Sequence, residues 1–92
     1  MAKEQAVWEK LDDDAYAILQ MAGKEYASEG ERLENFIVIG ELLNLSAREV
    51  LLVYLMKHIL SICKGVSLRE PMRGRVIDAM NYLRLLALME QE

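Results

Sequence analysis

Ninety-two residues allow one domain and exclude a second, because a chain of this length has material for a single hydrophobic core. Hydrophobic residues make up 53% of the chain and charged residues 28%. This apolar share is high for a small protein, whose surface is large relative to its volume, so we expect some apolar surface to contact a partner. The formal net charge of −4 disfavours an electrostatic contact with nucleic acid.

No segment of the sequence is typical of export or of membrane insertion. The first residues lack the basic and apolar pattern of a secretory signal, and the apolar segment 50–63 is shorter than the roughly twenty residues that cross a bilayer. The single cysteine, Cys63, cannot form an intramolecular disulfide, which favours a reducing compartment such as the cytoplasm. We expect Cys63 to be a buried structural thiol, since a free cysteine usually behaves as a small hydrophobic residue. The alternative is a nucleophile assisted by His58.

The elements are predicted to be helices with short joints, because the sequence contains one proline and no run that alternates like a strand. For residues 1–11 we expect either a helical turn or two, packed through Val7, Trp8 and Leu11, or terminal disorder. The acids of segment 12–14 predict the start of a first helix, where carboxylates cap free amides and oppose the positive end of the helix dipole. This helix is expected to end near residue 28.

A second helix is predicted over about residues 32–43, in which Gly40 would allow a close contact with another helix. Ser46 and Glu49 occupy the two positions of a capping box, where each side chain accepts a hydrogen bond from the backbone amide of the other residue. A third helix is therefore predicted from this point to about residue 64, and Gly65 is expected to end it.

Pro71 is suited to the first turn of a fourth helix, because its missing amide has no intrahelical partner there. This helix is expected to extend almost to the carboxyl terminus. It is apolar around most of its circumference and is interrupted by Asp78, Asn81 and Arg84. Such an apolar helix in so short a chain predicts burial in an oligomer core. We therefore expect one all-α domain of residues 1–92, similar to a four-helix bundle and assembled into a dimer or a tetramer.

Polar residues within the apolar helices are the candidates for chemistry, since the sequence has neither a glycine-rich phosphate loop nor paired cysteines for zinc. Lys57 is predicted to lie on nearly one face with Tyr54, Ser61 and Lys64, where it would bind a phosphate or a carboxylate. The alternative is a lysine that extends from the edge of the core or pairs with Asp78.

Acidic residues supply the candidate metal ligands. Asp78 is expected to be a metal ligand, a base, or the ion-pair partner of Arg75 or Lys57. Glu31 and Glu34 lie one helical turn apart, a spacing at which two carboxylates can share a magnesium ion. The alternative for this pair is a solvated helix face.

Four short segments occur in an order and at spacings that resemble a known family. They are Lys24-Glu25-Tyr26-Ala27, Glu34-Asn35-Phe36 with Ile39, Lys57 within an apolar helix, and Asp78-Ala79-Met80-Asn81-Tyr82. Over about residues 15–88 the chain is similar to the small phage and prophage proteins of the nucleotide-modification-associated domain type. Those proteins in turn resemble reduced relatives of the all-α nucleoside triphosphate pyrophosphohydrolases, which include MazG and the dimeric dUTPases.

The resemblance implies an oligomeric helical protein of the bacterial host cytoplasm that binds a nucleotide and Mg²⁺. In the enzymes, a metal-activated water attacks between the α and β phosphates. The nucleotide-binding residues that the resemblance implies are Tyr26, Asn35, Lys57 and Tyr82. The implied magnesium ligands are Glu31, Glu34 and Asp78, and the implied catalytic residues are Asp78 and Lys57. Arg75 stands where the enzymes have an acid, and Ala27 replaces a glycine. An active hydrolase and a nucleotide-binding protein without turnover therefore both stay open.

Two other functions remain as alternatives. The first is a non-catalytic interaction or adaptor protein that acts through a homodimer formed by its third and fourth helices. The second is DNA binding, because residues 39–50 resemble a helix-turn-helix. The second helix of that motif would present Leu51, Leu52 and Leu55, which are poor readers of base edges, on an acidic protein. Nucleic acid is therefore the least favoured partner.

Overall fold

The computed structural model describes residues 2–26, 33–65 and 71–91, with the side chains of residues 22–26 left aside. The described residues form four α-helices and no strand. These are α1 (Ala2–Tyr26), α2 (Glu34–Leu43), α3 (Ala47–Cys63) and α4 (Met72–Gln91). The predicted all-α class is confirmed.

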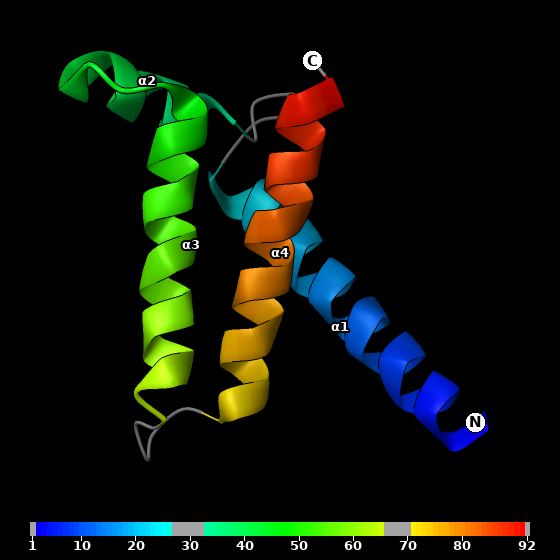
Figure 1. The fold of residues 1–92 in the computed structure, drawn as a ribbon. Coiled ribbons are helices and arrows are strands. Elements are labelled where there is room, and N and C mark those ends of the chain that lie inside the picture. The colour runs from blue at the N-terminus through cyan, green and yellow to red at the C-terminus, as the bar shows by residue number, and fades with distance from the viewer. Residues whose placement is uncertain (1, 27–32, 66–70, 92) are drawn as a thin grey trace.

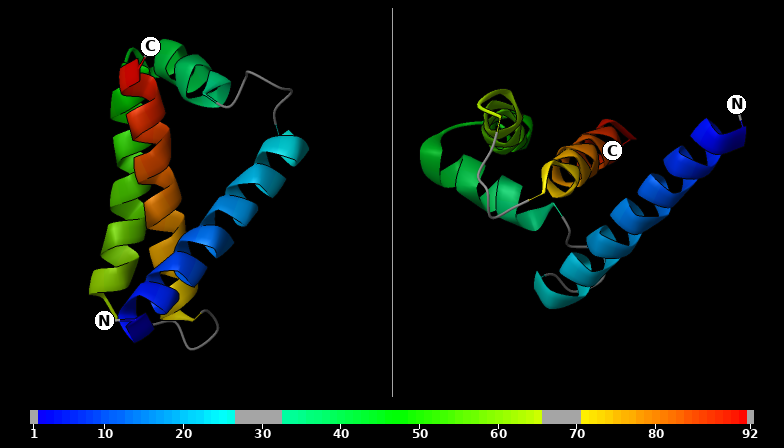
Figure 2. Two further views of the ribbon diagram at one scale, coloured as in Figure 1. Left: turned by 90° about the vertical axis from the view of Figure 1, so that its right-hand side faces the viewer. Right: turned by 90° about the horizontal axis from the view of Figure 1, so that it is seen from below.

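The centre of the fold is the pair formed by α3 and α4, which lie side by side and run in opposite directions (Figure 1). The short helix α2 packs on α3 near its amino end, and α1 packs on α4 from the other side. Among the described helices, the backbone of α1 approaches that of α4 alone. The two further views show α1 crossing α4 at an angle, and in the right-hand view the amino-terminal end of α1 lies away from the other helices (Figure 2).

The core lies where α2 covers α3 close to the end of α4. Leu33, Phe36, Val50 and Leu51 form its buried cluster, and Leu51 is fully enclosed. The partly buried residues packed against this cluster are Ile39, Ala47, Tyr54, Tyr82, Leu85, Leu86 and Met89. Because four of these come from α4, the core joins three of the helices.

The joint between α2 and α3 follows the predicted local pattern. The backbone amide of Leu45 donates to the carbonyl of Gly40 at 2.8 Å, and Asn44 adopts a left-handed conformation with φ +59°. Gly40 is buried, and the close contact expected with another helix is made with the backbone of this turn and of the first residue of α3. The capping box is confirmed, because the Glu49 amide donates to Ser46 Oγ and the Ser46 amide donates to Glu49 Oε1. These hydrogen bonds lower the pKa of Glu49 below its ordinary value.

The first helix differs from its prediction. It is continuous from Ala2, so a helix start at residues 12–14 is wrong. Residues 2–11 are helical, as the first of the two alternatives for this segment predicts, but Val7 and Trp8 are 59% and 63% exposed, and of the three expected packing residues only Leu11 is half-buried. Consecutive acids are typical of a helix start. The partners that Asp12 and Asp14 have in the structure lie far away in the sequence, so the local pattern does not reveal them.

Those partners are arginines on α4. Arg84 pairs with Asp12, and Arg73 Nη2 lies 2.8 Å from Asp14 Oδ2. The hydrogen bond from Arg73 is the main reason why the pKa of Asp14 is lowered. Between the two pairs, Asn81 Nδ2 donates to the carbonyl oxygen of Ala15 at 2.9 Å. Ala15 is fully buried, and its small side chain lets the two helices approach closely at the crossing.

The helix ends near the second joint lie within a residue or two of their predicted positions. Gly65 follows the end of α3 with a φ of +79°, a conformation that favours glycine. Pro71 directly precedes α4, and its carbonyl accepts from the amide of Gly74. Cys63 is exposed, so the expectation of a buried thiol is wrong. It lies seven residues after Met56, which is also exposed, and therefore on the side of α3 that faces solvent.

None of the described helices combines the length and the apolar character that a bilayer crossing requires.

Candidate functional site

Three aromatic rings from three helices meet where α2, α3 and α4 pack together. The ring of Phe36 lies edge-on to Tyr54 at 5.8 Å between centroids and edge-on to Tyr82 at 6.5 Å. Tyr54 and Tyr82 are stacked at 6.2 Å with an angle of 5° between their planes. Edge-on and stacked contacts of this kind stabilise aromatic pairs beyond their burial alone. Phe36 and Tyr82, which belong to two separate segments of the family-like pattern, are thus brought together.

The polar edge of this cluster is formed by His58 and Asp78. His58 follows Tyr54 by one helical turn, and its ring lies 5.0 Å from that of Tyr82. Its Nδ1 atom is 3.9 Å from Asp78 Oδ2, and the side chains of His58 and Asp78 are 26% and 49% exposed. Water therefore reaches this edge. We name these five residues the α3–α4 cluster: Phe36, Tyr54, His58, Asp78 and Tyr82.

The surroundings of Tyr82 favour its protonated form. Burial is the main cause that raises the pKa of Tyr82, and the carboxylate of Asp78 and the neighbouring Tyr54 raise it further. The phenol of Tyr82 is therefore a hydrogen-bond donor over the physiological pH range. Asp78 faces His58, and neither Arg75 nor Lys57 is its partner in the described part of the chain.

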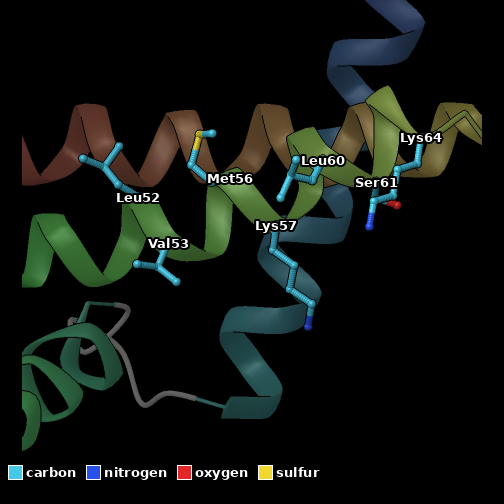
Figure 3. A pocket seen from close by; sticks show the side chains of 7 residues that line it. All are labelled: Leu52, Val53, Met56, Lys57, Leu60, Ser61 and Lys64. Carbon is cyan, nitrogen blue, oxygen red and sulfur yellow. The ribbon is translucent and has the colours of Figure 1, made fainter.

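Lys57 lies on a different face of α3. Its side chain is exposed and lines a shallow groove of about 700 Å³. Ser61 and Lys64 line the same groove, in agreement with the prediction that they share a helix face with Lys57. The remaining lining residues are Leu52, Val53, Met56 and Leu60 (Figure 3). Tyr54 is absent from this face because its ring is turned toward Phe36, so the predicted grouping holds without it. No ion pair of Lys57 occurs within residues 2–26, 33–65 and 71–91.

Arg75 is held in place by a different contact. It is buried, and its Nη1 atom donates to the backbone carbonyl of Ser61 at 2.9 Å. This bond ties the first turns of α4 to a carbonyl near the end of α3, where helix carbonyls lack intrahelical donors. Arg75 therefore helps to hold α4 against α3.

The two predicted magnesium ligands that the structure describes, Glu34 and Asp78, are not gathered into one site. Glu34 is exposed in the first turn of α2, Asp78 belongs to the α3–α4 cluster, and Glu31 lies outside the described residues. In the part of the chain that is described, no group of three or more histidine, cysteine or acidic side chains is placed to hold a metal ion. The described residues do not form a magnesium site within one chain, and the binding of Mg²⁺ stays a prediction.

The predicted nucleotide ligands are likewise distributed. Tyr82 is half-buried in the α3–α4 cluster, whereas Asn35 and Lys57 are exposed on separate helices. The side chain of Tyr26 lies outside the described residues. His58 was not among the predicted ligands, although one signal for it exists in the sequence. His58 follows Tyr54 by four residues and Tyr82 follows Asp78 by four, so each pair shares a helix face.

The surface of the molecule is large for its mass. The accessible area is 7155 Å², whereas a compact monomer of 10.6 kDa exposes about 5,500 Å². The radius of gyration is 14.6 Å, against about 12 Å for a compact domain of this length. Many of the exposed side chains are large and apolar, and on α3 they include Val53, Met56 and Leu60, each more than half exposed.

These features define an all-α protein with a compact aromatic cluster and an extensive apolar surface. Comparisons of the chain with protein-family models, with curated protein sequences and with solved structures give no match.

Proposed function

We propose that this chain is a non-catalytic helical interaction protein whose working form is an assembly of copies. The observation that carries this proposal is the uncovered surface, which exceeds that of a compact monomer of 10.6 kDa by about 1,700 Å². Obligate homodimers bury roughly 1,000–2,500 Å² on each subunit. An interface that covers this excess surface would therefore have the size usual for an obligate homodimer. Apolar side chains on such a surface favour association, because burying them releases ordered water.

The arrangement of α1 supports the same proposal. Its amino-terminal half carries exposed apolar side chains, Val7 and Trp8 among them, and in the right-hand view its amino-terminal end lies away from the other helices (Figure 2). A helix end of this kind is stabilised mainly by packing against another surface. We place the assembly in the cytoplasm, because the lone exposed thiol of Cys63 is best preserved in a reducing compartment.

The mass of the protein in solution tests this proposal. Sedimentation velocity across a hundredfold range of protein concentration is expected to give a dimer or a higher species, at a whole multiple of 10.6 kDa. A single monomeric species throughout that range would refute the proposal, whatever the protein binds in addition.

A nucleotide-binding protein is the second candidate. It is favoured by the convergence of Phe36, Asp78 and Tyr82, three residues of the family-like pattern, in the α3–α4 cluster. The open edge offers the ring of His58 for stacking on a base and the phenol of Tyr82 as a donor. Pyrophosphohydrolase activity is the more specific form of this candidate, and it requires metal ligands that one described chain does not bring together.

Thermal shift and pyrophosphate release test this second candidate together. The ligands are a panel of nucleoside triphosphates with and without Mg²⁺, and the proteins are the wild type and Asp78→Ala. A nucleotide that binds the native state raises the melting temperature. Stabilisation that Asp78→Ala weakens would support binding at the cluster, and metal-dependent turnover lost in the variant would support the hydrolase. No stabilisation at millimolar nucleotide would refute both forms.

A further inference from the structure

The outward face of α3 carries an apolar seam with the spacing of a coiled coil. Val53, Met56, Leu60 and Cys63 follow one another at intervals of three, four and three residues, and all four are exposed. This alternation of three and four keeps a line of side chains on one side of a helix and lets it interlock with a second helix. The opposite face of α3 is occupied by the core and by α4, so the seam is the face that remains uncovered.

Charged residues border this seam in an asymmetric way. Glu49 lies on the same face, four residues before Val53, in the first turn of α3. Lys57 and Lys64 lie along the seam in its middle and at its carboxyl end (Figure 3). The acid is therefore at one end of the face and a base is at the other. Glu49 uses Oε1 in the capping box, and in the described part of the chain its other carboxylate oxygen makes no hydrogen bond.

We propose that a second copy of this chain packs its own α3 against this seam in antiparallel orientation, about a two-fold axis. This proposal rests on the proposed function and names the partner and the surface. Positions 49 and 64 are equidistant from a point between Met56 and Lys57. With the two-fold axis at that point, Glu49 of each copy faces Lys64 of the other, and Val53 faces Leu60. A parallel pair would instead place like charges beside each other, which disfavours it.

The size of the uncovered surface and the directions of the helix dipoles are both consistent with a second copy of the chain at this seam. A standard interface buries about 800 Å² on each partner, which is within the roughly 1,700 Å² by which the surface exceeds that of a compact monomer. Antiparallel helices also place the negative carboxyl end of one dipole beside the positive amino end of the other. Each lysine keeps its ammonium at the rim while its methylene groups cover the apolar seam.

The first experiment places charges in the seam. The double variant Met56→Glu, Leu60→Glu is compared by sedimentation velocity with wild type and with Leu42→Glu, which makes the same kind of change at an exposed site on α2. Both seam residues are more than half exposed in the single chain, so the variant should keep its helical circular dichroism. We expect the dimer dissociation constant to rise at least on the order of 100-fold, because carboxylates buried without partners oppose association. Leu42→Glu should leave it unchanged.

The second experiment determines orientation by cross-linking in a Cys63→Ser background. A protein with Val53→Cys and Leu60→Cys together is expected to form a covalent dimer on mild oxidation, while Val53→Cys alone is not. A wild type that is oligomeric and stays so in the double glutamate variant would overturn this interface and leave the proposed function standing. A monomeric wild type would overturn both. Efficient cross-linking of Val53→Cys alone would overturn the antiparallel arrangement.

Discussion

Replacing Gly40 with alanine tests how closely the α2–α3 joint is packed. A Cβ atom at this position would lie 2.5 Å from the carbonyl oxygen of Leu45 and 3.3 Å from the carbonyl carbon of Ser46. Both are backbone atoms, and the Leu45 amide donates a hydrogen bond to the carbonyl of Gly40 at 2.8 Å. The clash therefore cannot be relieved by a side-chain rotation. It requires that the turn move away from α2, which also disturbs the capping box that follows.

The magnitude comes from two opposing effects. Overpacking of this kind typically costs about 1–3 kcal/mol, and the change from glycine to alanine inside a helix returns about 1 kcal/mol. We expect the steric effect to prevail, because 2.5 Å is far inside the distance at which a carbon and an oxygen touch. A net loss of about 1–2 kcal/mol lowers the Tm of a chain of this size by roughly 5–15 °C.

Gly74→Ala is the matched control. Gly74 lies in α4 and a Cβ atom there would meet nothing within 4 Å. The substitution should therefore stabilise the protein by up to about 1 kcal/mol, through a lower entropy of the unfolded chain. Both variants are melted at one protein concentration, since association adds to apparent stability. A Gly40→Ala protein that melts at or above the temperature of wild type would refute the packing argument.

Three further predictions concern polar contacts. Asn81→Ala removes the buried hydrogen bond to the carbonyl of Ala15 and should lower the unfolding free energy by about 1–3 kcal/mol in urea; an unchanged midpoint would contradict this. Arg73 lowers the pKa of Asp14 below 3.8, so the stability from this pair is present above that pH and is lost as the pH falls through the lowered pKa. The Tm values of wild type and Arg73→Ala should therefore converge in acid, and a difference that persists there would contradict the pairing. Burial raises the pKa of Tyr82 above 10.0, so the stability that its neutral phenol contributes is present below pH 10 and is lost at more alkaline pH. An absorbance titration of the four tyrosines should show a late component that Tyr82→Phe removes, and its survival in the variant would assign it to another residue.

Local features of the chain could be predicted from the sequence, because their causes lie within a few residues. Ser46 and Glu49 are three positions apart, and the hydrogen bonds they exchange follow from that spacing alone. Gly65 stops α3 for a similarly local reason, its left-handed backbone. The all-α class follows from many such local signals acting together.

Features that depend on distant partners could not be predicted in this way. Asp12 and Asp14 have the composition of a helix start, but their arginine partners are 72 and 59 residues away in the sequence. The sequence predicts a buried Cys63 because a free cysteine usually behaves as a small hydrophobic residue, but α3 is apolar on several sides, and periodicity does not identify which of these faces meets the core. For the same reason, the sequence predicts only part of the candidate site. Asp78 and Tyr82 were identified, whereas His58 becomes their neighbour only when α3 and α4 pack together.

The crossing of α1 and α4 has a consequence for local opening. Hydrogen bonds and ion pairs attach α1 through a short stretch around Ala15, while most residues before it are exposed. Amide hydrogens near Ala15 should exchange with deuterium only when α1 leaves α4 altogether. Those of the first turns should exchange through fraying of the helix end, which requires far less free energy. A single helix would thus contain two populations of exchange rates, separated at the point where Asp12 meets its arginine.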